Sequence, residues 1–181
     1  MRSFLVGMSR IVKKKLKVID GVNVCNDGYF FVVSGKTEKI SVNLNGLVAV
    51  SGDKDLSFQS LEDKDRGMLG SSYVLIKNAM NDVTNGFSAK LKMVGVGFKA
   101  NVTGKFLRVY IGFSHDVFIA IPDALKVEVI NDVDITVKGY NRSDVMQFAR
   151  TVRDMKKPEP YKGKGIFLND EKVVRKEGKK K

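Results

Sequence analysis

The alternation of hydrophobic and polar positions predicts the same set of elements twice along the chain. In the first copy an apolar run follows Gly28 and ends before Gly35, and in the second copy a similar run follows Gly104 and ends before Gly112. Three further strands follow each run at a nearly constant offset. In pairs, these strands are 40–44 and 117–121, 47–50 and 127–130, and 55–58 and 134–137.

A helix with an apolar stripe is predicted to close each copy. We expect the first helix from about Asp65 to Val83, with an acidic residue at its start. The second helix is predicted to begin with Ser143 as its N-cap and to stop before Pro158. The predicted stripes are Met68, Ser72, Leu75, Ile76, Ala79, Met80 and Val83 in the first helix, and Val145, Phe148, Ala149, Val152 and Met155 in the second.

These patterns predict an α+β fold of two tandem repeats, each a small, mainly antiparallel sheet covered on one face by one helix. We expect the first repeat over 18–87 and the second over 88–157, with a short connection near 85–90. Extended basic segments are expected at 1–17 and 158–181. The prolines and glycines that follow Lys157 prevent a regular helix in the second of these segments.

The composition favours a folded chain without export or membrane segments. Of the 181 residues, 43% are hydrophobic and 29% are charged, which is typical of a chain that buries a core. The apolar stretch over 4–7 is too short for a signal peptide, and no run approaches the about 18 apolar residues of a spanning helix. The single cysteine, Cys25, excludes an internal disulfide.

The net charge of +12 is concentrated at the two ends of the chain. Residues 1–17 hold six basic residues and no acidic one, and residues 150–181 hold twelve basic residues against five acidic ones. The span between them is nearly neutral. Two cationic ends favour a polyanionic partner, because neutralised phosphates release counterions. Neither end has the large apolar helix face of a membrane anchor, so we expect a nucleic acid.

Three patterns suggest enzymatic chemistry, and each fails on its context. Residues 95–100, Gly-Val-Gly-Phe-Lys-Ala, match a loose dinucleotide motif, but a strand rather than a helix is predicted after them. Ser114, His115 and Asp116 are neighbours in sequence, so their side chains diverge and cannot form a triad. Cys25 has no histidine to activate it, and no residues show metal-ligand spacing. We expect no enzyme, cofactor or small-molecule substrate; a nucleotide-dependent enzyme built on 95–100 is the rival hypothesis.

The segment 161–166, Tyr-Lys-Gly-Lys-Gly-Ile, is the most informative for function. Glycines allow close backbone approach, lysines bind phosphates and the tyrosine can stack on a base, which suits structured RNA. A solvated loop is the alternative, but the preceding helix already ends in basic residues. We predict RNA contacts at Arg153, Lys156, Lys157, Tyr161, Lys162, Gly163, Lys164, Gly165, Arg175 and Lys176, with Lys92, Lys99 and His115 as weaker candidates.

Five short motifs carry a family resemblance. They are Met8-Ser-Arg-Ile, Gly95-Val-Gly-Phe, Gly112-Phe-Ser-His, Lys157-Pro-Glu-Pro-Tyr-Lys-Gly-Lys-Gly-Ile166 and Arg175-Lys-Glu-Gly-Lys. Together they resemble the bacterial-type large-subunit ribosomal protein six, the universal L-six family, from Met8 onward. The resemblance implies a duplicated α+β fold with no enzymatic activity. It also implies that the second domain and the C-terminal tail bind large-subunit ribosomal RNA near the translation-factor-binding region.

Some positions depart from the pattern of that family. Val12 and Lys15 replace a usual glycine and proline, and Asp116 stands where a proline is usual. Translation could start at Met1 or at Met8. The resemblance implies a ribosome, in a bacterial cytoplasm or an organelle, with ribosomal RNA and neighbouring ribosomal proteins as partners. An RNA-binding or RNA-chaperone module acting outside the ribosome is the alternative function.

Overall fold

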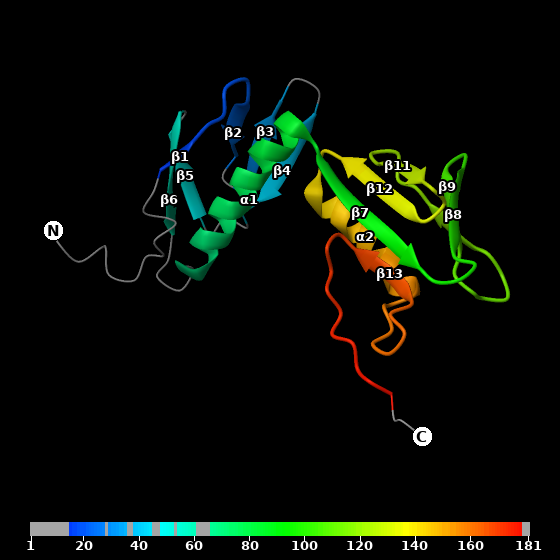
Figure 1. Ribbon diagram of the computed structural model, residues 1–181. Helices are drawn as coiled ribbons and strands as arrows, with labels where there is room; N and C mark the ends of the chain where they lie inside the picture. Colours follow the sequence, from blue (N-terminus) through cyan, green and yellow to red (C-terminus); the bar gives the residue numbers. More distant parts are fainter. Residues whose placement is uncertain are drawn as a thin grey trace. The chain divides into compact units, whose positions relative to one another are not determined.

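The computed structural model describes residues 15–27, 29–35, 38–44, 48–52, 54–60 and 66–178. The chain forms two compact units, residues 1–86 and 87–181, and each combines one helix with antiparallel strands (Figure 1). The predicted α+β class is therefore confirmed. The basic segment predicted at 1–17 lies outside the described residues except for 15–17.

The first unit contains two three-stranded sheets among its described residues, in the orders β1-β6-β5 and β2-β3-β4. Helix α1 packs against β3, β4, β5 and β6, and Phe31, Leu56, Leu69 and Ile76 are almost completely buried between them. The elements are β1 (Leu16–Lys17), β2 (Asn23–Asn26), β3 (Phe30–Ser34), β4 (Lys39–Asn43), β5 (Val48–Ser51), β6 (Asp55–Ser60) and α1 (Arg66–Asn85).

The second unit repeats this arrangement and adds one strand. One sheet has the order β11-β12-β7-β13 and the other has the order β10-β9-β8. Helix α2 lies along β7, β12 and β13 (Figure 1). The elements are β7 (Phe87–Val94), β8 (Lys99–Thr103), β9 (Phe106–Tyr110), β10 (Val117–Ala120), β11 (Lys126–Ile130), β12 (Asp134–Gly139), α2 (Arg142–Met155) and β13 (Gly165–Leu168).

The order of the strands shows the duplication directly. The sheet β1-β6-β5 corresponds to β7-β12-β11, and β2-β3-β4 corresponds to β8-β9-β10. Strands β1, β2, β7, β8 and β13 were not among the elements predicted from the sequence. Strand β7 could have been predicted, because apolar Ala89, Leu91 and Met93 alternate in the sequence with polar Ser88 and Lys90. In the structure the three apolar residues are buried and the two polar ones are exposed.

Two features of the helices correct the predictions. In α1, Met68 and Leu75 are exposed, because the buried stripe runs through Leu69 and Ile76, one residue further along the helix. The other predicted stripe residues of α1 are buried. In α2, the N-cap is Asn141 rather than Ser143, since its side-chain oxygen accepts a hydrogen bond of 3.1 Å from the Ser143 backbone N–H.

The connection between α1 and β7 consists of one residue. Gly86 has a φ of 72° and donates a backbone hydrogen bond of 2.8 Å to Asp82, which is how a glycine ends a helix. Strand β7 begins at Phe87. Most of the predicted connection over 85–90 therefore belongs to a strand.

The segment after Pro158 also contains a strand. Gly165–Leu168 form β13, which pairs antiparallel with β7 and places Ile166 opposite Met93. Ile166 is fully buried in the core of the second unit. The basic segment predicted over 158–181 is thus anchored by the free edge of β7, whose backbone groups need partners.

Candidate nucleic-acid interface

The candidate interface begins where α2 ends. Val145, Phe148, Ala149 and Val152 face the core, so the helix turns its basic residues outward in its last turns. Lys156 is the C-cap, and Lys157 after it is exposed. The helix therefore delivers two adjacent lysines to the start of the loop that leads to β13.

The loop between α2 and β13 has a defined backbone. Glu159 N–H donates to the Lys164 carbonyl at 2.8 Å, and Gly163 N–H donates to the Glu159 carbonyl at 3.0 Å. These bonds close a turn whose tip exposes Tyr161, with 56% of its surface accessible, and Lys162. Lys164 is exposed on the same turn. Tyr161, Lys162 and Lys164 are therefore presented on a hydrogen-bonded turn and not on an irregular extended segment.

The two glycines of this loop contact the protein itself. Gly163 has a φ of 67°, and a Cβ built on it would lie 3.2 Å from the Arg175 guanidinium. Gly165 has a φ of 145°, and its Cβ would lie 2.7 Å from the Pro158 Cα and 2.8 Å from the Lys157 carbonyl oxygen. Glycine is therefore required at both positions because the backbone approaches another surface closely, as predicted. That surface belongs to this protein and not to a partner.

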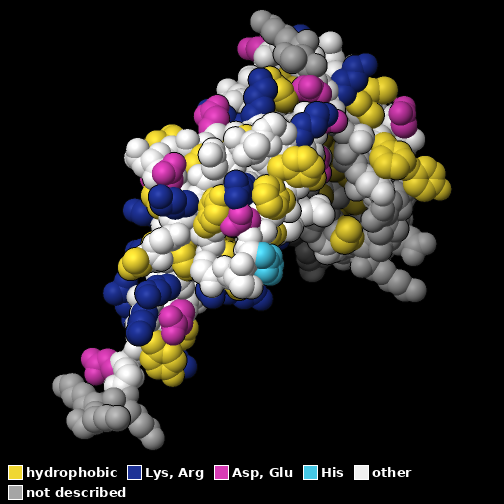
Figure 2. All heavy atoms as spheres, turned by 90° about the vertical axis from the view of Figure 1, so that its right-hand side faces the viewer, with side chains coloured by type: hydrophobic (Ala, Val, Ile, Leu, Met, Phe, Trp, Pro, Cys, Tyr) yellow, Lys and Arg dark blue, Asp and Glu magenta, His cyan; other side chains and the backbone are white. Residues whose placement is uncertain are grey.

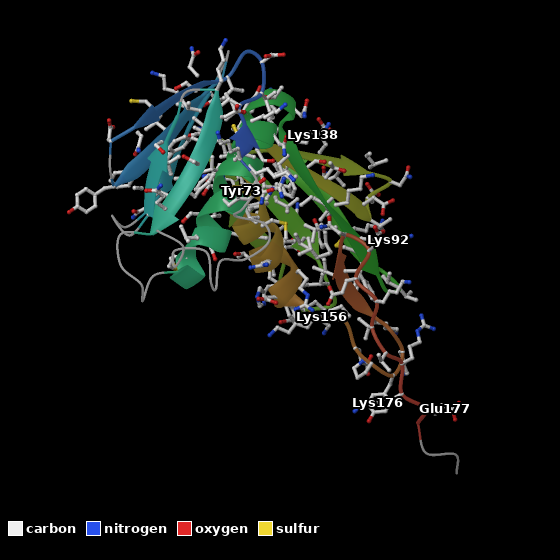
Figure 3. All side chains as sticks on the ribbon, turned by 90° about the vertical axis from the view of Figure 1, so that its left-hand side faces the viewer. Tyr73, Lys92, Lys138, Lys156, Lys176 and Glu177 are labelled. Carbon is white, nitrogen blue, oxygen red and sulfur yellow. The ribbon has the colours of Figure 1, made fainter. Side chains whose placement is uncertain are left out.

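The C-terminal segment returns to the loop. Lys176 N–H donates to the Pro160 carbonyl at 2.9 Å, which places Lys176 and Arg175 beside the tip that carries Tyr161. Both basic side chains are exposed. Figure 3 shows Lys156 at the end of α2 and Lys176 further along the C-terminal segment. Residues far apart in sequence thus join one cationic surface, which we call the loop surface: Lys156, Lys157, Tyr161, Lys162, Lys164, Arg175 and Lys176.

Arg153 is engaged within the protein. Its Nε donates to Glu171 at 3.3 Å, its Nη2 donates to the other carboxylate oxygen of Glu171, and its Nη1 donates to Asp154 at 3.0 Å. The hydrogen bond from Arg153 lowers the pKa of Glu171, and the same bond raises the pKa of Arg153. Arg153 therefore holds the segment after β13 against α2, and its positive charge is paired with Glu171 and Asp154.

His115 lies next to the loop surface, to which an aromatic neighbour connects it. The rings of Phe113 and His115 are stacked with centroids 6.1 Å apart, and the Lys156 ammonium lies 5.3 Å from the Phe113 ring centroid. Phe113 and His115 are both exposed. Phe113 was not among the residues predicted from the sequence to bind RNA, although it belongs to the Gly112-Phe-Ser-His motif. The signal that could have indicated it is an aromatic residue in a predicted turn.

The other two weaker candidates lie elsewhere on the second unit. Lys92 is exposed on β7, between Asp134 of β12 and Phe167 of β13 in register (Figure 3). It lines a shallow hollow that also contains Asp134 and Asp170, so charges of both signs meet there. Lys99 is exposed at the start of β8. The structure does not place either lysine within the loop surface.

The described residues offer no catalytic or metal site. Gly95 to Phe98 form a turn closed by a hydrogen bond of 3.3 Å, and β8 rather than a helix follows it. Asp116 accepts hydrogen bonds from Arg108, not from His115. No group of three potential metal ligands occurs in the described part of the chain. Within that part, neither helix has the length and apolar content to cross a membrane.

Two similar α+β units, one of which gathers exposed lysines and aromatic rings on an ordered loop, define a duplicated α+β protein with a cationic surface. Comparison with known proteins gives the particular family. A model of the family described as Ribosomal protein L6 matches residues 94–167. The chain belongs to the ribosomal protein L6 family, which is a structural and non-enzymatic one.

The relatives cover nearly the whole chain. Large ribosomal subunit protein uL6 of Sphingopyxis alaskensis is 38% identical over 177 residues, which is 96% of this chain and all of the relative. The proteins of the same name from Pseudomonas fluorescens strain Pf0-1 and Alcanivorax borkumensis are 37% and 38% identical over the same shares. The family resemblance seen in the sequence is therefore confirmed.

Proposed function

We propose that this chain is seated in the large ribosomal subunit and stabilises folded ribosomal RNA there through the loop surface, near the region where translation factors bind. The observation that carries this proposal is the closed turn over 159–164, which presents Tyr161, Lys162 and Lys164 to the outside on a fixed backbone. The family resemblance supports the ribosomal RNA as the polyanion.

The loop surface is suited to a phosphate backbone. Its exposed lysines and Arg175 can each neutralise a phosphate, with release of counterions. Tyr161 and the Phe113–His115 pair offer ring faces for stacking on unpaired bases. Because the turn is already closed, little backbone entropy is lost on binding. In this proposal Arg153, Gly163 and Gly165 act by holding the loop and the C-terminal segment in place.

The proposal predicts that Lys162→Glu combined with Lys164→Glu weakens binding to transcribed large-subunit ribosomal RNA. The slope of log Kobs against log salt should fall by about 2, since two phosphate contacts are lost. Titration at several salt concentrations measures both quantities. The matched control is Lys39→Glu with Lys77→Glu, which makes the same charge change at exposed positions of the first unit; it should leave the slope nearly unchanged.

Equal effects of the two double variants would contradict the proposal, because they would show that only the net charge matters. A second measurement separates the ribosomal role from that of a free RNA chaperone. The wild-type chain should cosediment with large subunits through a high-salt gradient, whereas a loosely attached chaperone should dissociate.

A further inference from the structure

The outward face of the sheet β8-β9-β10 carries aromatic side chains where polar ones are expected. Along β9, Leu107 and Val109 are fully buried, while Phe106, Arg108 and Tyr110 point to the other side. Residues directly opposite one another in a sheet share a face, and Arg108 stands opposite Phe118 of β10. Phe106, Arg108, Tyr110 and Phe118 therefore form one surface, which we call the aromatic face.

The aromatic face is exposed in the structure. Phe118 has 57% of its surface accessible and Phe106 has 49%. The residues opposite Phe106 on the two neighbouring strands, Ala120 and Thr103, have small side chains that do not cover it. Figure 2 shows hydrophobic side chains exposed among basic ones on the side of the molecule where β8 and β9 lie in Figure 1. Exposing two phenylalanines side by side to water is unfavourable, and such exposed apolar patches are typical of interaction sites.

Arg108 is fixed in the middle of this face. Its guanidinium carbon lies 4.8 Å from the Tyr110 ring centroid and 5.4 Å from that of Phe118. Its Nε donates to Asp116 at 3.1 Å, and its Nη2 also donates to Asp116. Asp116 is the residue that departs from the usual proline of the family. The aspartate at this position therefore has a structural consequence, because its hydrogen bonds fix Arg108 beside the rings of Tyr110 and Phe118.

The charge of the aromatic face does not match a polyanion. Asp116 neutralises Arg108, and Lys105 in the turn between β8 and β9 pairs with Asp123 at 2.7 Å. Lys99 stands opposite Tyr110 and so shares this face, and among the described residues it is the one cation there without an acidic partner. The loop surface differs, because Lys157, Lys162 and Lys164 are exposed there and form no ion pair among the described residues. Phosphates would gain little on the aromatic face, whereas an apolar protein surface would gain the burial of two phenylalanines.

We propose that the aromatic face is the contact of this chain with a neighbouring protein of the particle, through an apolar and nearly uncharged segment of that protein. Aromatic residues and arginine dominate the energetic centres of protein interfaces, and here they are already ordered by the Asp116 pair. The proposal rests on the proposed function, because it assumes that the chain sits in the large subunit. It assigns RNA and protein to two different surfaces of the same unit.

Photo-crosslinking in intact large subunits tests this assignment. The variant Phe118→p-benzoyl-phenylalanine should crosslink to a protein, and Tyr161→p-benzoyl-phenylalanine should crosslink to RNA. Crosslinking of position 118 to RNA, or to nothing, would overturn the further inference and leave the proposed function standing. If position 161 yields no RNA, the proposed function fails instead.

A double variant gives a second and independent measurement. Phe106→Ser with Phe118→Ser should leave affinity for naked ribosomal RNA within about twofold of wild type, but lower retention in washed large subunits by at least about tenfold. The matched control is Val96→Ser with Ile130→Ser, which removes two exposed apolar side chains elsewhere on the unit. Equal retention of the two double variants, or loss of affinity for naked RNA, would overturn the inference.

Discussion

At the scale of single residues, Gly165 connects the loop surface to the core. Its φ of 145° is a conformation that residues with a side chain avoid, and any Cβ would overlap the backbone of Lys157 and Pro158. The next residue, Ile166, is fully buried and donates a backbone hydrogen bond of 2.9 Å to Lys156. The glycine thus lets the chain pass from an exposed turn to a buried strand within one residue.

We predict that Gly165→Ala lowers the free energy of unfolding by about 2 kcal/mol, because the new methyl group meets backbone atoms that cannot move independently. Thermal or denaturant unfolding measures this change. Gly178→Ala is the matched control, since Gly178 has open space around it and no unusual φ. The control should stay within about 0.5 kcal/mol of wild type; a comparable loss in both variants would refute the role of Gly165.

Residue identities alone did not show which basic side chains are free. Lys162 and Arg153 look equivalent in the sequence, but Arg153 is bound to Glu171, which lies 18 positions away. Phe113 had no predicted role, because its contact with Lys156 depends on how the turn before β10 meets the end of α2. Charge can be read from sequence, whereas the partner of a charge depends on tertiary contacts.

At the scale of elements, the link between α2 and the segment after β13 is the Arg153–Glu171 ion pair. Both side chains are about a quarter exposed, with accessible fractions of 26% and 27%. Glu171 also accepts a hydrogen bond of 3.4 Å from the Leu168 backbone N–H. The pair therefore fixes the direction in which the chain leaves β13 toward Arg175.

We predict that Glu171→Gln destabilises the protein by about 1 kcal/mol at neutral pH. Because the pKa of Glu171 is lowered in the folded state, its contribution is complete above the pKa of the unfolded chain and is lost as the pH falls through the lower folded value. The difference in unfolding free energy between wild type and variant should therefore shrink on acidification. Denaturant unfolding from pH 7 to pH 3 measures it, and a difference that stays constant with pH would contradict the prediction.

The elements themselves were predictable to different degrees. Strands β9 to β12 and the buried stripe of α2 follow clear periodic patterns, and the structure contains them. Strand β13 escaped prediction, because Gly165–Leu168 is short and directly follows the lysines and glycine of 162–164. Its strand form depends on the free edge of β7, which is a property of the fold and not of the segment.

At the scale of the whole molecule, each unit has its own core. One cluster of buried residues lies in the first unit, around Phe31 and Ile76, and another lies in the second, around Leu91 and Phe148. All of the proposed RNA contacts lie within 87–181, the second unit. Folding and RNA binding of this unit should therefore need few contributions from the first.

We predict that a fragment comprising residues 87–181 folds and binds large-subunit ribosomal RNA with a Kd less than about tenfold above that of the full chain, a loss below about 1.4 kcal/mol. Circular dichroism checks the fold, and a titration at fixed salt gives the Kd. The complementary fragment 1–86 should bind far more weakly. A fragment 87–181 that folds but loses most of its affinity would show that the basic residues near the N-terminus carry the binding.

The amino-acid sequence by itself determined the α+β class, the duplication and the concentration of positive charge at the ends, because periodicity and composition are local properties that each segment carries alone. Only the tertiary structure decided which residues meet. It placed Gly165 against Pro158, bound Arg153 to Glu171, brought Phe113 into contact with Lys156 and His115, and turned Phe106 and Phe118 outward together. These contacts join residues from different elements, and their geometry exists only once the strands and helices have packed.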